Sequence, residues 1–398
     1  SRTLPLESDV TTDQMVVDAH AQVSHTHLGN VVAGRAITDG TFQIAATTQQ
    51  MDLSGHGVLG GLPSDITYFM NFRSLRPQDT AEKAHLFTRI TPDTASAAGI
   101  DTSTHFYGSA DLGVDYARLG NKHGSVDISL DLKRSGIVIP LWHKAAGRAA
   151  QVSATLALLD GRIPSVENIF ATGPELDVRG HALLREKAAP EVRVSSFRIA
   201  RSTGHARLVL PYASQDKTIQ VGVYADTLDL APLMEGDPNA PKQTSSGYHV
   251  PEAATGKLHG PPGNAWTIDM TANALYYSQT KQPLQDVTGH FEDNGQRLER
   301  MRFAMRGPSP VTMTLEPKGA VRTLHVTIPD MGGFLAALNI LPNVQGGHAT
   351  LTGAFDDTQA SAPFKGTVRV SPFVLKKAPA TVRLARNLSL YGWLNARK

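Results

Sequence analysis

The chain has 398 residues, of which 41% are hydrophobic and 19% are charged, and this balance is typical of a folded protein. Its formal net charge is only +2 and its basic residues are dispersed, so the sequence does not indicate a nucleic-acid partner. The lack of cysteine excludes disulfides, thiolate metal ligands and cysteine nucleophiles, and no run approaches the roughly 18 apolar residues that a membrane-spanning helix requires.

An eight-residue segment occurs twice in the first half of the chain. Residues 52–59 read Asp-Leu-Ser-Gly-His-Gly-Val-Leu, and residues 177–184 read Asp-Val-Arg-Gly-His-Ala-Leu-Leu. Asp39-Gly40 and Asp160-Gly161 each open a short alternating segment before one copy. Self-similarity in a chain of turns and short strands predicts stacked β units that share one continuous hydrophobic surface.

Apolar residues alternate with polar ones along most of the chain, which predicts half-buried β-strands. Glycine-containing dipeptides at residues 39–40, 160–161, 294–295 and 346–347 can take the positive φ of tight turns, so we expect antiparallel hairpins. The alternating apolar positions are Phe42 and Ile44; Val126, Ile128, Leu130 and Leu132; Val152, Ala154, Leu156 and Leu158; Ile219, Val221 and Val223; Ile268 and Met270; Leu324, Val326 and Ile328; and Val368 and Val370.

Helical periodicity is limited to short pieces at residues 228–234 and 333–341 and to an amphipathic stretch near the end, where Leu384, Leu388 and Tyr391 share one face. Residues 235–263 are rich in Pro, Gly, Ser and charge, and they have no periodicity. We interpret them as a long surface loop or linker, with a true domain boundary as the alternative. The expected organisation is a first β unit at 1–115, a second at 116–234, and a final β unit with a terminal helix at 264–398.

Several short elements occur in the order found in the AsmA-like family of bacterial envelope proteins. Residues 226–233 (Asp-Thr-Leu-Asp-Leu-Ala-Pro-Leu) resemble the element that ends a β unit in that family, and residues 266–289 resemble the unit that follows. Residues 329–338, 346–353 and 364–370 are similar to the AsmA-like carboxy-terminal region of YhdP and its relatives. Residues 139–147 resemble the family's tryptophan-lysine-glycine element, so the likeness covers most of residues 40–394.

The resemblance implies a bridge-like lipid transport protein in the bacterial periplasm. Its fold would be a long, curved antiparallel sheet whose concave apolar face carries phospholipid acyl chains between the inner and outer membranes, with head groups in water. The family's pattern begins with an inner-membrane anchor and continues beyond the region that matches residue 393. We therefore expect this chain to be a soluble piece of a longer, anchored protein, with phospholipid or another acyl-chain lipid as its ligand and envelope proteins as possible partners.

A sheet with one apolar face must bury that face against a second layer or a ligand. Periodicity alone favours a closed sandwich or barrel, whereas the family resemblance favours an open apolar groove filled with lipid. The predicted fold class is therefore all-β with minor short helices, an elongated and curved antiparallel sheet of repeated β units that forms an apolar groove. The candidate lipid-binding residues are Phe42, Ile44, Val126, Ile128, Leu130, Leu156, Ile219, Val221, Val223, Ile268, Met270, Leu324, Val326 and Val368.

Patterns that could carry catalysis or metal binding have simpler interpretations. Residues 55–60 match the spelling G-x-G-x-x-G, but no helical pattern follows and the second copy of the repeat lacks the later glycines, so a turn and strand is favoured. His20, His25 and His27 are interpreted as surface residues. The acidic pairs at 292–293 and 356–357 lie in turn-like sequence. We therefore expect no enzyme activity, no cofactor and no metal.

The three tryptophans Trp142, Trp266 and Trp393 could contact lipid, but core packing is the favoured interpretation. Two functions of other classes stay open. A structural or adaptor protein would tolerate polar breaks in the apolar surface. A carbohydrate-binding β protein would expose aromatic platforms, and the aromatic content of 6% argues against it.

Overall fold

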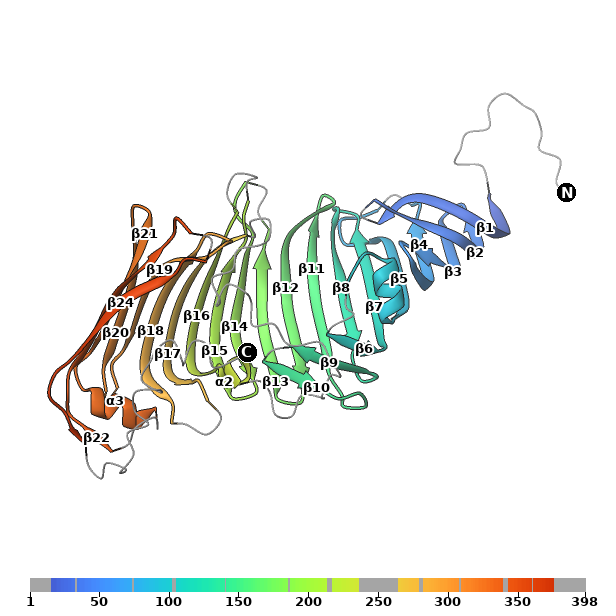
Figure 1. Ribbon diagram of the computed structural model, residues 1–398. Coiled ribbons are helices and arrows are strands. Elements are labelled where there is room, and N and C mark those ends of the chain that lie inside the picture. Colours follow the sequence, from blue (N-terminus) through green and yellow to red (C-terminus); the bar gives the residue numbers. More distant parts are fainter. Residues whose placement is uncertain are drawn as a thin grey trace. The chain divides into compact units, whose positions relative to one another are not determined.

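The computed structural model in Figure 1 describes residues 16–375, except 33, 74, 102–104, 140, 185–186, 213–216, 236–263, 279–281, 308, 339–342 and 360. The chain forms two compact units, Ser1–Ser246 and Gly247–Lys398. Antiparallel strands make up most of both units, and the described residues contain three short helices. The predicted all-β class with minor helices is confirmed, as is an open antiparallel sheet in place of a sandwich.

The sheet of the first unit is built by pairing each strand with its neighbours in chain order, as Figure 1 shows from blue to green. Its first and last strands, β1 and β16, are not paired with each other in the described part of the unit, so the sheet is open. Its strands are β1 (Asp18–Val32), β2 (Arg35–Thr47), β3 (Gln50–Leu59), β4 (Leu62–Asn71), β5 (Thr80–Ile90), β7 (Ala110–Leu119), β8 (His123–Asp131), β11 (Gln151–Leu159), β12 (Arg162–Gly173), β13 (Leu176–Leu183), β14 (Glu191–Ile199), β15 (Ser202–Val209) and β16 (Thr218–Asp229).

The second unit repeats this design on a smaller scale. Two short strands, β22 (Val344–Gln345) and β25 (Val374–Leu375), form a separate ladder beside helix α3 (Met331–Ala337). The strands of its larger sheet are β17 (Ala265–Tyr276), β18 (Leu284–Asp293), β19 (Leu298–Met305), β20 (Val311–Lys318), β21 (Val321–Ile328), β23 (Ala349–Asp356) and β24 (Phe364–Val370).

A small sheet packs on the first unit at one end of its strands. It consists of β6 (Phe106–Gly108), β9 (Ser135–Ile139) and β10 (Trp142–Lys144). Trp142 is buried against Ala110, Leu132 and Leu176, and its indole Nε1 donates a hydrogen bond of 2.7 Å to the carbonyl of Pro174. The expected core packing of Trp142 is therefore confirmed, and the segment that resembles the family's tryptophan-lysine-glycine element forms this cover.

Helix α1 (Pro92–Ala97) lies at the same end of the strands as the small sheet, directly after β5. Thr91 begins it with a capping box, in which its hydroxyl accepts from the Thr94 amide while the Thr94 hydroxyl accepts from the Thr91 amide. Pro92 suits the first helical position because it lacks an amide hydrogen there. Sequence analysis did not predict this helix, although the Thr-Pro-Asp-Thr signal was present.

The other short helices were predicted, and the turns were predicted in part. Helix α2 (Ala231–Glu235) and α3 overlap the predicted helical pieces at 228–234 and 333–341, although residues 228–229 belong to β16. Residues 160–161 form the expected tight turn between β11 and β12, with positive φ at both residues, and residues 294–295 lie in the turn between β18 and β19.

Two of the four turn dipeptides were wrongly predicted as hairpin turns. Asp39 has φ of 52°, but it lies inside β2, where the pairing with β3 shifts register between Thr38 and Thr41. This is a β-bulge, which uses the same backbone conformation as a tight turn. Gly346 and Gly347 connect β22 to β23, which pair with β25 and β21 and not with each other.

The expected division at residues 115 and 116 falls within β7, which pairs along its length with β5 and β8. The first residue of the expected loop at 235–263, Glu235, ends helix α2, and the rest of the loop lies outside the described residues. The amphipathic stretch that carries Leu384, Leu388, Tyr391 and Trp393 also lies outside them.

Candidate functional site

Strand register places most of the apolar strand residues of the first unit on one face of its sheet. Directly opposed residues of an antiparallel pair point to the same side, so the face can be followed from strand to strand. Ile44 lies opposite Leu53, Ile66 opposite Leu86, and Val114 opposite Ile128. We call this surface the first apolar face. Its mid-strand members include Ala21, Ile44, Leu53, Ile66, Leu86, Val114, Ile128, Ala154, Ile169, Val194, Ala206 and Val223.

The second unit has an equivalent surface, the second apolar face. Ile268 lies opposite Phe291, which lies opposite Met301 and, across the next ladder, Leu315. Val326, Leu351 and Val368 continue the row. Its members are Ile268, Met270, Val287, Phe291, Met301, Phe303, Met305, Val311, Met313, Leu315, Leu324, Val326, Ile328, Leu351, Val368 and Val370.

All fourteen predicted lipid-contact residues lie on these two faces. Within each unit, the structure therefore aligns side chains that are far apart in the sequence. In the first unit they are Phe42, Ile44, Val126, Ile128, Leu130, Leu156, Ile219, Val221 and Val223. In the second unit they are Ile268, Met270, Leu324, Val326 and Val368.

The middle of the first apolar face is only half-buried. Ile44, Leu53, Ile66, Val114 and Ile128 all keep part of their side chains accessible, unlike the residues of a closed core. In the described part of the unit, α1 and the small sheet pack on this face, and both lie at the end of the strands where β5 ends and β7 begins. The apolar face is covered along one edge and accessible over its middle.

Glycines make room for the Phe42 ring to pack over the backbone on this face. A Cβ at Gly55 would stand 2.7 Å from Cδ1 of Phe42, and one at Gly40 would stand 2.4 Å from Cε2 of the same ring. Phe42 is consequently only 1% exposed. Gly55 belongs to the segment with dinucleotide-loop spelling, and that segment forms strand β3 as expected.

The register places three charged residues on the first apolar face, all near strand ends. Arg35 lies at the covered edge, where it donates to the carbonyls of Gly60 and Ala98, at 3.1 and 3.2 Å. Glu82 and Arg118 lie directly opposite each other near the other edge and form an ion pair. The mid-strand part of the first apolar face, which we call the apolar band, contains no charged residue among the described positions.

Cross-strand hydrogen bonds and ion pairs cover the opposite, polar face. His85 Nδ1 and Asp115 Oδ1 are 2.7 Å apart, and Arg89 Nε donates to Asp111 over 2.9 Å. In the second unit, Arg300 bridges Glu292 and Glu316, and His290 lies between Asp269 and Glu292. These two carboxylates raise the pKa of His290. Away from the strand ends, both sheets therefore separate apolar from charged side chains across their thickness.

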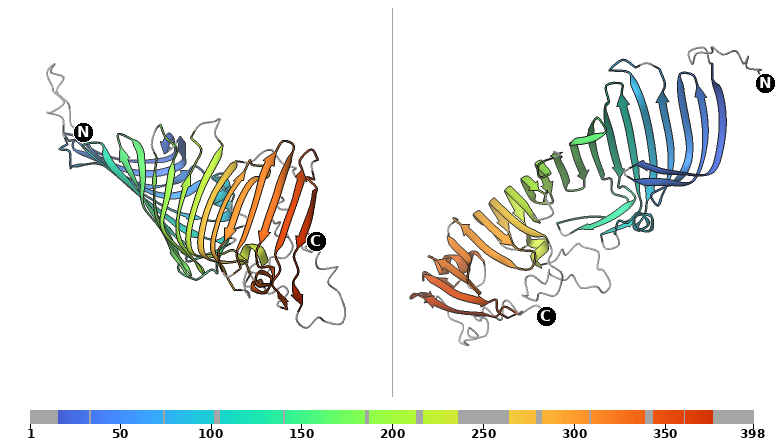
Figure 2. Two further views of the ribbon diagram at one scale, coloured as in Figure 1. Left: turned by 90° about the vertical axis from the view of Figure 1, so that its left-hand side faces the viewer. Right: turned by 90° about the horizontal axis from the view of Figure 1, so that it is seen from above.

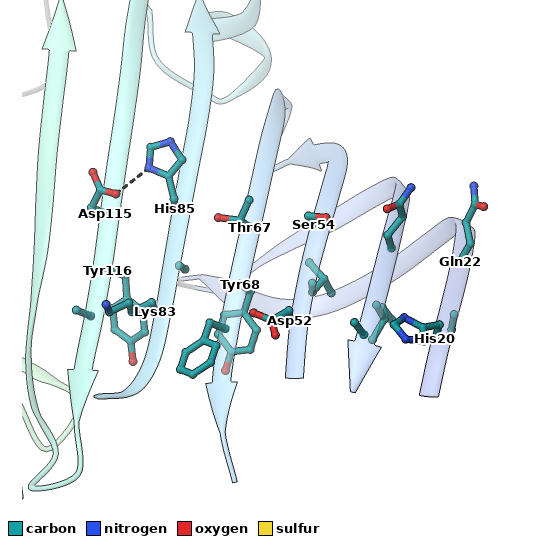
Figure 3. A pocket seen from close by; sticks show the side chains of 18 of the residues that line it. His20, Gln22, Asp52, Ser54, Thr67, Tyr68, Lys83, His85, Asp115 and Tyr116 are labelled. Atoms are coloured by element: carbon teal, nitrogen blue, oxygen red, sulfur yellow. Dashed lines mark hydrogen bonds and ion pairs between the residues drawn. The ribbon is translucent and has the colours of Figure 1, made fainter. Parts of the chain in front are cut away.

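A hollow of about 940 Å³ lies over β1 to β5, β7 and β8, and its lining comes mainly from the polar face. Figure 3 shows His85 turned toward Asp115, while Tyr68 and Tyr116 direct their hydroxyls toward the strand ends where β7 finishes. A second hollow of about 350 Å³ adjoins Asp115 and Asp127. Sequence reasoning did not predict these hollows because they depend on sheet curvature. The polar residues around the larger one are His20, Gln22, Gln43, Asp52, Ser54, Thr67, Lys83, His85, Asp115 and Asp127.

The histidines that were considered as metal ligands do not form a cluster. His20 and His25 lie beside Asp18 and Asp39, all well exposed, and the described residues hold no group of three or more potential metal ligands. Trp266 is 39% exposed, so core packing was the wrong expectation for it.

The two acidic pairs have structural partners. Asp293 accepts from the Gly295 amide and Asp356 from the Thr358 amide, as turn residues do. Glu292, however, lies within β18, where Arg300 and His290 contact it. The side chain of Asp357 is buried, with Arg322 and Arg297 as its partners. These pairings match the charges locally and assemble no catalytic pair.

Comparison with protein-family models, with curated proteins and with solved structures found no match for this chain. None of the described helices has the length and apolar character that crossing a membrane demands. The likeness to AsmA-like proteins thus rests on the order of short sequence elements.

Proposed function

We propose that the chain is the periplasmic part of an inner-membrane-anchored, AsmA-like protein that guides phospholipids between the inner and outer membranes. The acyl chains would lie along the apolar faces, and the head groups would remain in water. This proposal makes the protein a passive carrier and not an enzyme. The observation that carries it is the half-buried apolar band of the first unit, which contains no charged residue at the described mid-strand positions.

Hydrophobic energetics favour a ligand on this band. Apolar surface in water costs about 25 cal/mol per Å², and each buried methylene contributes about 0.8 kcal/mol. Covering the face formed by Ile44, Leu53, Ile66 and Ile128 with any apolar group would therefore lower the free energy. Acyl chains are long, thin and uniform, so they can cover a row of small and medium side chains without matching individual pockets.

A scaffold or adaptor protein is the competing proposal, since a protein partner could also cover an apolar face. A lipid track requires that apolar character persist from strand to strand, whereas an adaptor surface tolerates polar breaks. The first apolar face persists through β1 to β16, and its charged residues Arg35, Glu82 and Arg118 lie near strand ends. This distribution supports the lipid track.

Two matched pairs of charge substitutions test the proposal. Ile128→Glu and Val221→Glu place a carboxylate on the apolar band, whereas Ser153→Glu and Gln220→Glu place it on the polar face of adjacent or identical strands. We expect the first two to reduce the amount of co-purifying phospholipid at least several-fold, because a carboxylate is costly to bury among acyl chains.

The control variants should keep the wild-type lipid content. Far-ultraviolet circular dichroism and urea unfolding would establish that all four proteins are folded. Equal lipid content in all four folded variants would contradict an acyl-chain track at Ile128 and Val221.

A further inference from the structure

One edge of the first apolar face is not covered by α1 or the small sheet, and this edge carries a compact polar cluster. Glu82 on β5 lies directly opposite Arg118 on β7 and forms an ion pair with it. The Tyr116 hydroxyl donates to Glu82 over 3.0 Å. Tyr68 lies on the same face, opposite Ala84, which in turn lies opposite Tyr116. The cluster therefore combines a cation, an anion and two phenol hydroxyls.

This cluster and the elements that cover the face lie at different ends of the strands. Helix α1 and the small sheet lie where β5 ends and β7 begins, whereas Glu82 is near the start of β5 and Arg118 near the end of β7. An acyl chain that lies on the apolar band would thus have α1 and the small sheet at one edge and this polar cluster at the other. In Figure 3 the Tyr68 and Tyr116 hydroxyls point toward the strand ends at which β7 finishes, which is the edge that carries the cluster.

The cluster remains accessible. The side chains of Arg118 and Glu82 are 33% and 18% exposed, which means that solvent reaches both groups. Partly exposed ion pairs add little net stability because water screens them, so a ligand with matching charges can replace one with little loss. The Tyr68 hydroxyl has no hydrogen-bond partner among the described residues, which leaves it able to donate.

The protonation states suit binding of both charges. The hydrogen bond from Arg118 lowers the pKa of Glu82, so this carboxylate is ionised at neutral pH. Burial, followed by the charge of Glu82, raises the pKa of Tyr68 to about 12, and burial also raises the pKa of Tyr116. Both phenols therefore stay protonated and can act as donors.

We infer that Glu82, Arg118, Tyr68 and Tyr116 form a subsite for a zwitterionic phospholipid head group, one that carries a phosphate and an ammonium. Arg118 and the tyrosine hydroxyls would contact the phosphate oxygens, and Glu82 would contact the ammonium. A head group of this kind replaces the Glu82–Arg118 pair without leaving a charge unmatched. An anionic head group that lacks an ammonium would leave Glu82 beside a phosphate, which is repulsive. This inference rests on the proposed lipid-carrying function.

A lipid competition experiment tests the subsite. Delipidated protein is incubated with vesicles of equimolar phosphatidylethanolamine and phosphatidylglycerol that have the same acyl chains, re-isolated and extracted, and both bound lipids are quantified. We expect the wild type to hold at least three times more phosphatidylethanolamine than phosphatidylglycerol. Glu82→Gln should bring this ratio close to one, because the ammonium loses its partner and the phosphate loses its repulsion. Arg118→Gln should lower the loading of both lipids.

The chain offers a matched control on the same two strands. Arg89 on β5 and Asp111 on β7 are also directly opposed and ion-paired, but they lie on the polar face. Asp111→Asn should therefore leave the lipid ratio at its wild-type value. Thermal unfolding of each variant would establish the folded fraction.

The outcomes separate the subsite from the lipid track itself. A wild type that loads both lipids equally, or a Glu82→Gln variant that keeps the wild-type ratio, would overturn the subsite while lipid carriage stands. A folded wild type that loads neither lipid would overturn the proposed function and the subsite together.

Discussion

At the scale of single residues, the apolar faces depend on glycine as much as on large side chains. Phe42 is almost completely buried because its ring lies over Gly40 and Gly55. Phe364 has the same relation to Gly353 and Gly366 in the second unit. A ring that packs over glycines does not protrude, which keeps the face smooth where a ligand chain would lie.

Gly55→Ala should lower the free energy of unfolding by about 1–3 kcal/mol, the usual cost of overpacking. The added Cβ would stand 2.1 Å from the carbonyl oxygen of Thr41 and 2.7 Å from the Phe42 ring, so backbone or ring must move. Gly29→Ala is the matched control on β1, because nothing lies within 4 Å of its added Cβ and a change within about 0.5 kcal/mol is expected. Urea denaturation measures both values, and equal effects would refute the packing argument.

The sequence was informative about residues with regular spacing and uninformative about isolated pairs. Period-two alternation placed all fourteen candidate residues on the apolar faces because side-chain direction in a strand follows from position alone. Glu82 and Arg118 are far apart in the chain, and only the register of β5 against β7 makes them neighbours. Asp39 shows the same limit, since positive φ serves a bulge as well as a turn.

At the scale of elements, the polar face is stabilised by charges that bridge adjacent strands. Glu191 on β14 accepts from Arg193 on the same strand over 2.6 Å and from Arg207 on β15 over 2.8 Å. Arg193 and Arg207 are directly opposite one another, so Glu191 also offsets their mutual repulsion. Hydrogen bonds from Arg207 and then Arg193 lower the pKa of Glu191 to about 2.

This lowered pKa predicts an acid-sensitive contribution to stability. Because the pKa is lower in the folded protein than the ordinary 4.5, ionised Glu191 stabilises the fold above pH 4.5, and the contribution is lost as the pH falls toward 2. Wild type should therefore be more stable than Glu191→Gln near pH 7, and the difference should shrink between pH 4.5 and 2. Urea unfolding across this range measures it. A difference that stays constant with pH would contradict the assignment to Glu191.

The short elements were harder to predict than the long strands. Helix α1 depends on a local capping signal around Thr91 and Pro92, which the alternation of the flanking strands obscures. The small sheet of β6, β9 and β10 has strands too short for a reliable period, although Trp142 marked it as a buried site. These elements determine which edge of the first apolar face is covered. The polar cluster could therefore be assigned to the uncovered edge only from the structure.

At the scale of the whole molecule, both units show one design, in which an antiparallel sheet has one apolar and one charged face. Periodicity predicted the alternation of the two faces, but on its own it wrongly favoured a closed sandwich or barrel, in which a second layer would cover the apolar face. The structure corrects this within the described first unit, where only one edge of the face carries α1 and the small sheet. An apolar band that stays half-buried in the folded chain is the physical basis for proposing a lipid ligand.

Photocrosslinking with a phospholipid that carries a diazirine in its acyl chain would show directly where acyl chains lie on the protein. After loading and irradiation, peptide mass spectrometry locates the labelled residues. We expect labels on the first apolar face, at positions such as Ile128 and Val221, and very few on Ser129 or Gln220 of the polar face. Equal labelling of both faces, or labels concentrated around Lys83 and His85 in the polar hollow, would contradict an acyl-chain track on the apolar face.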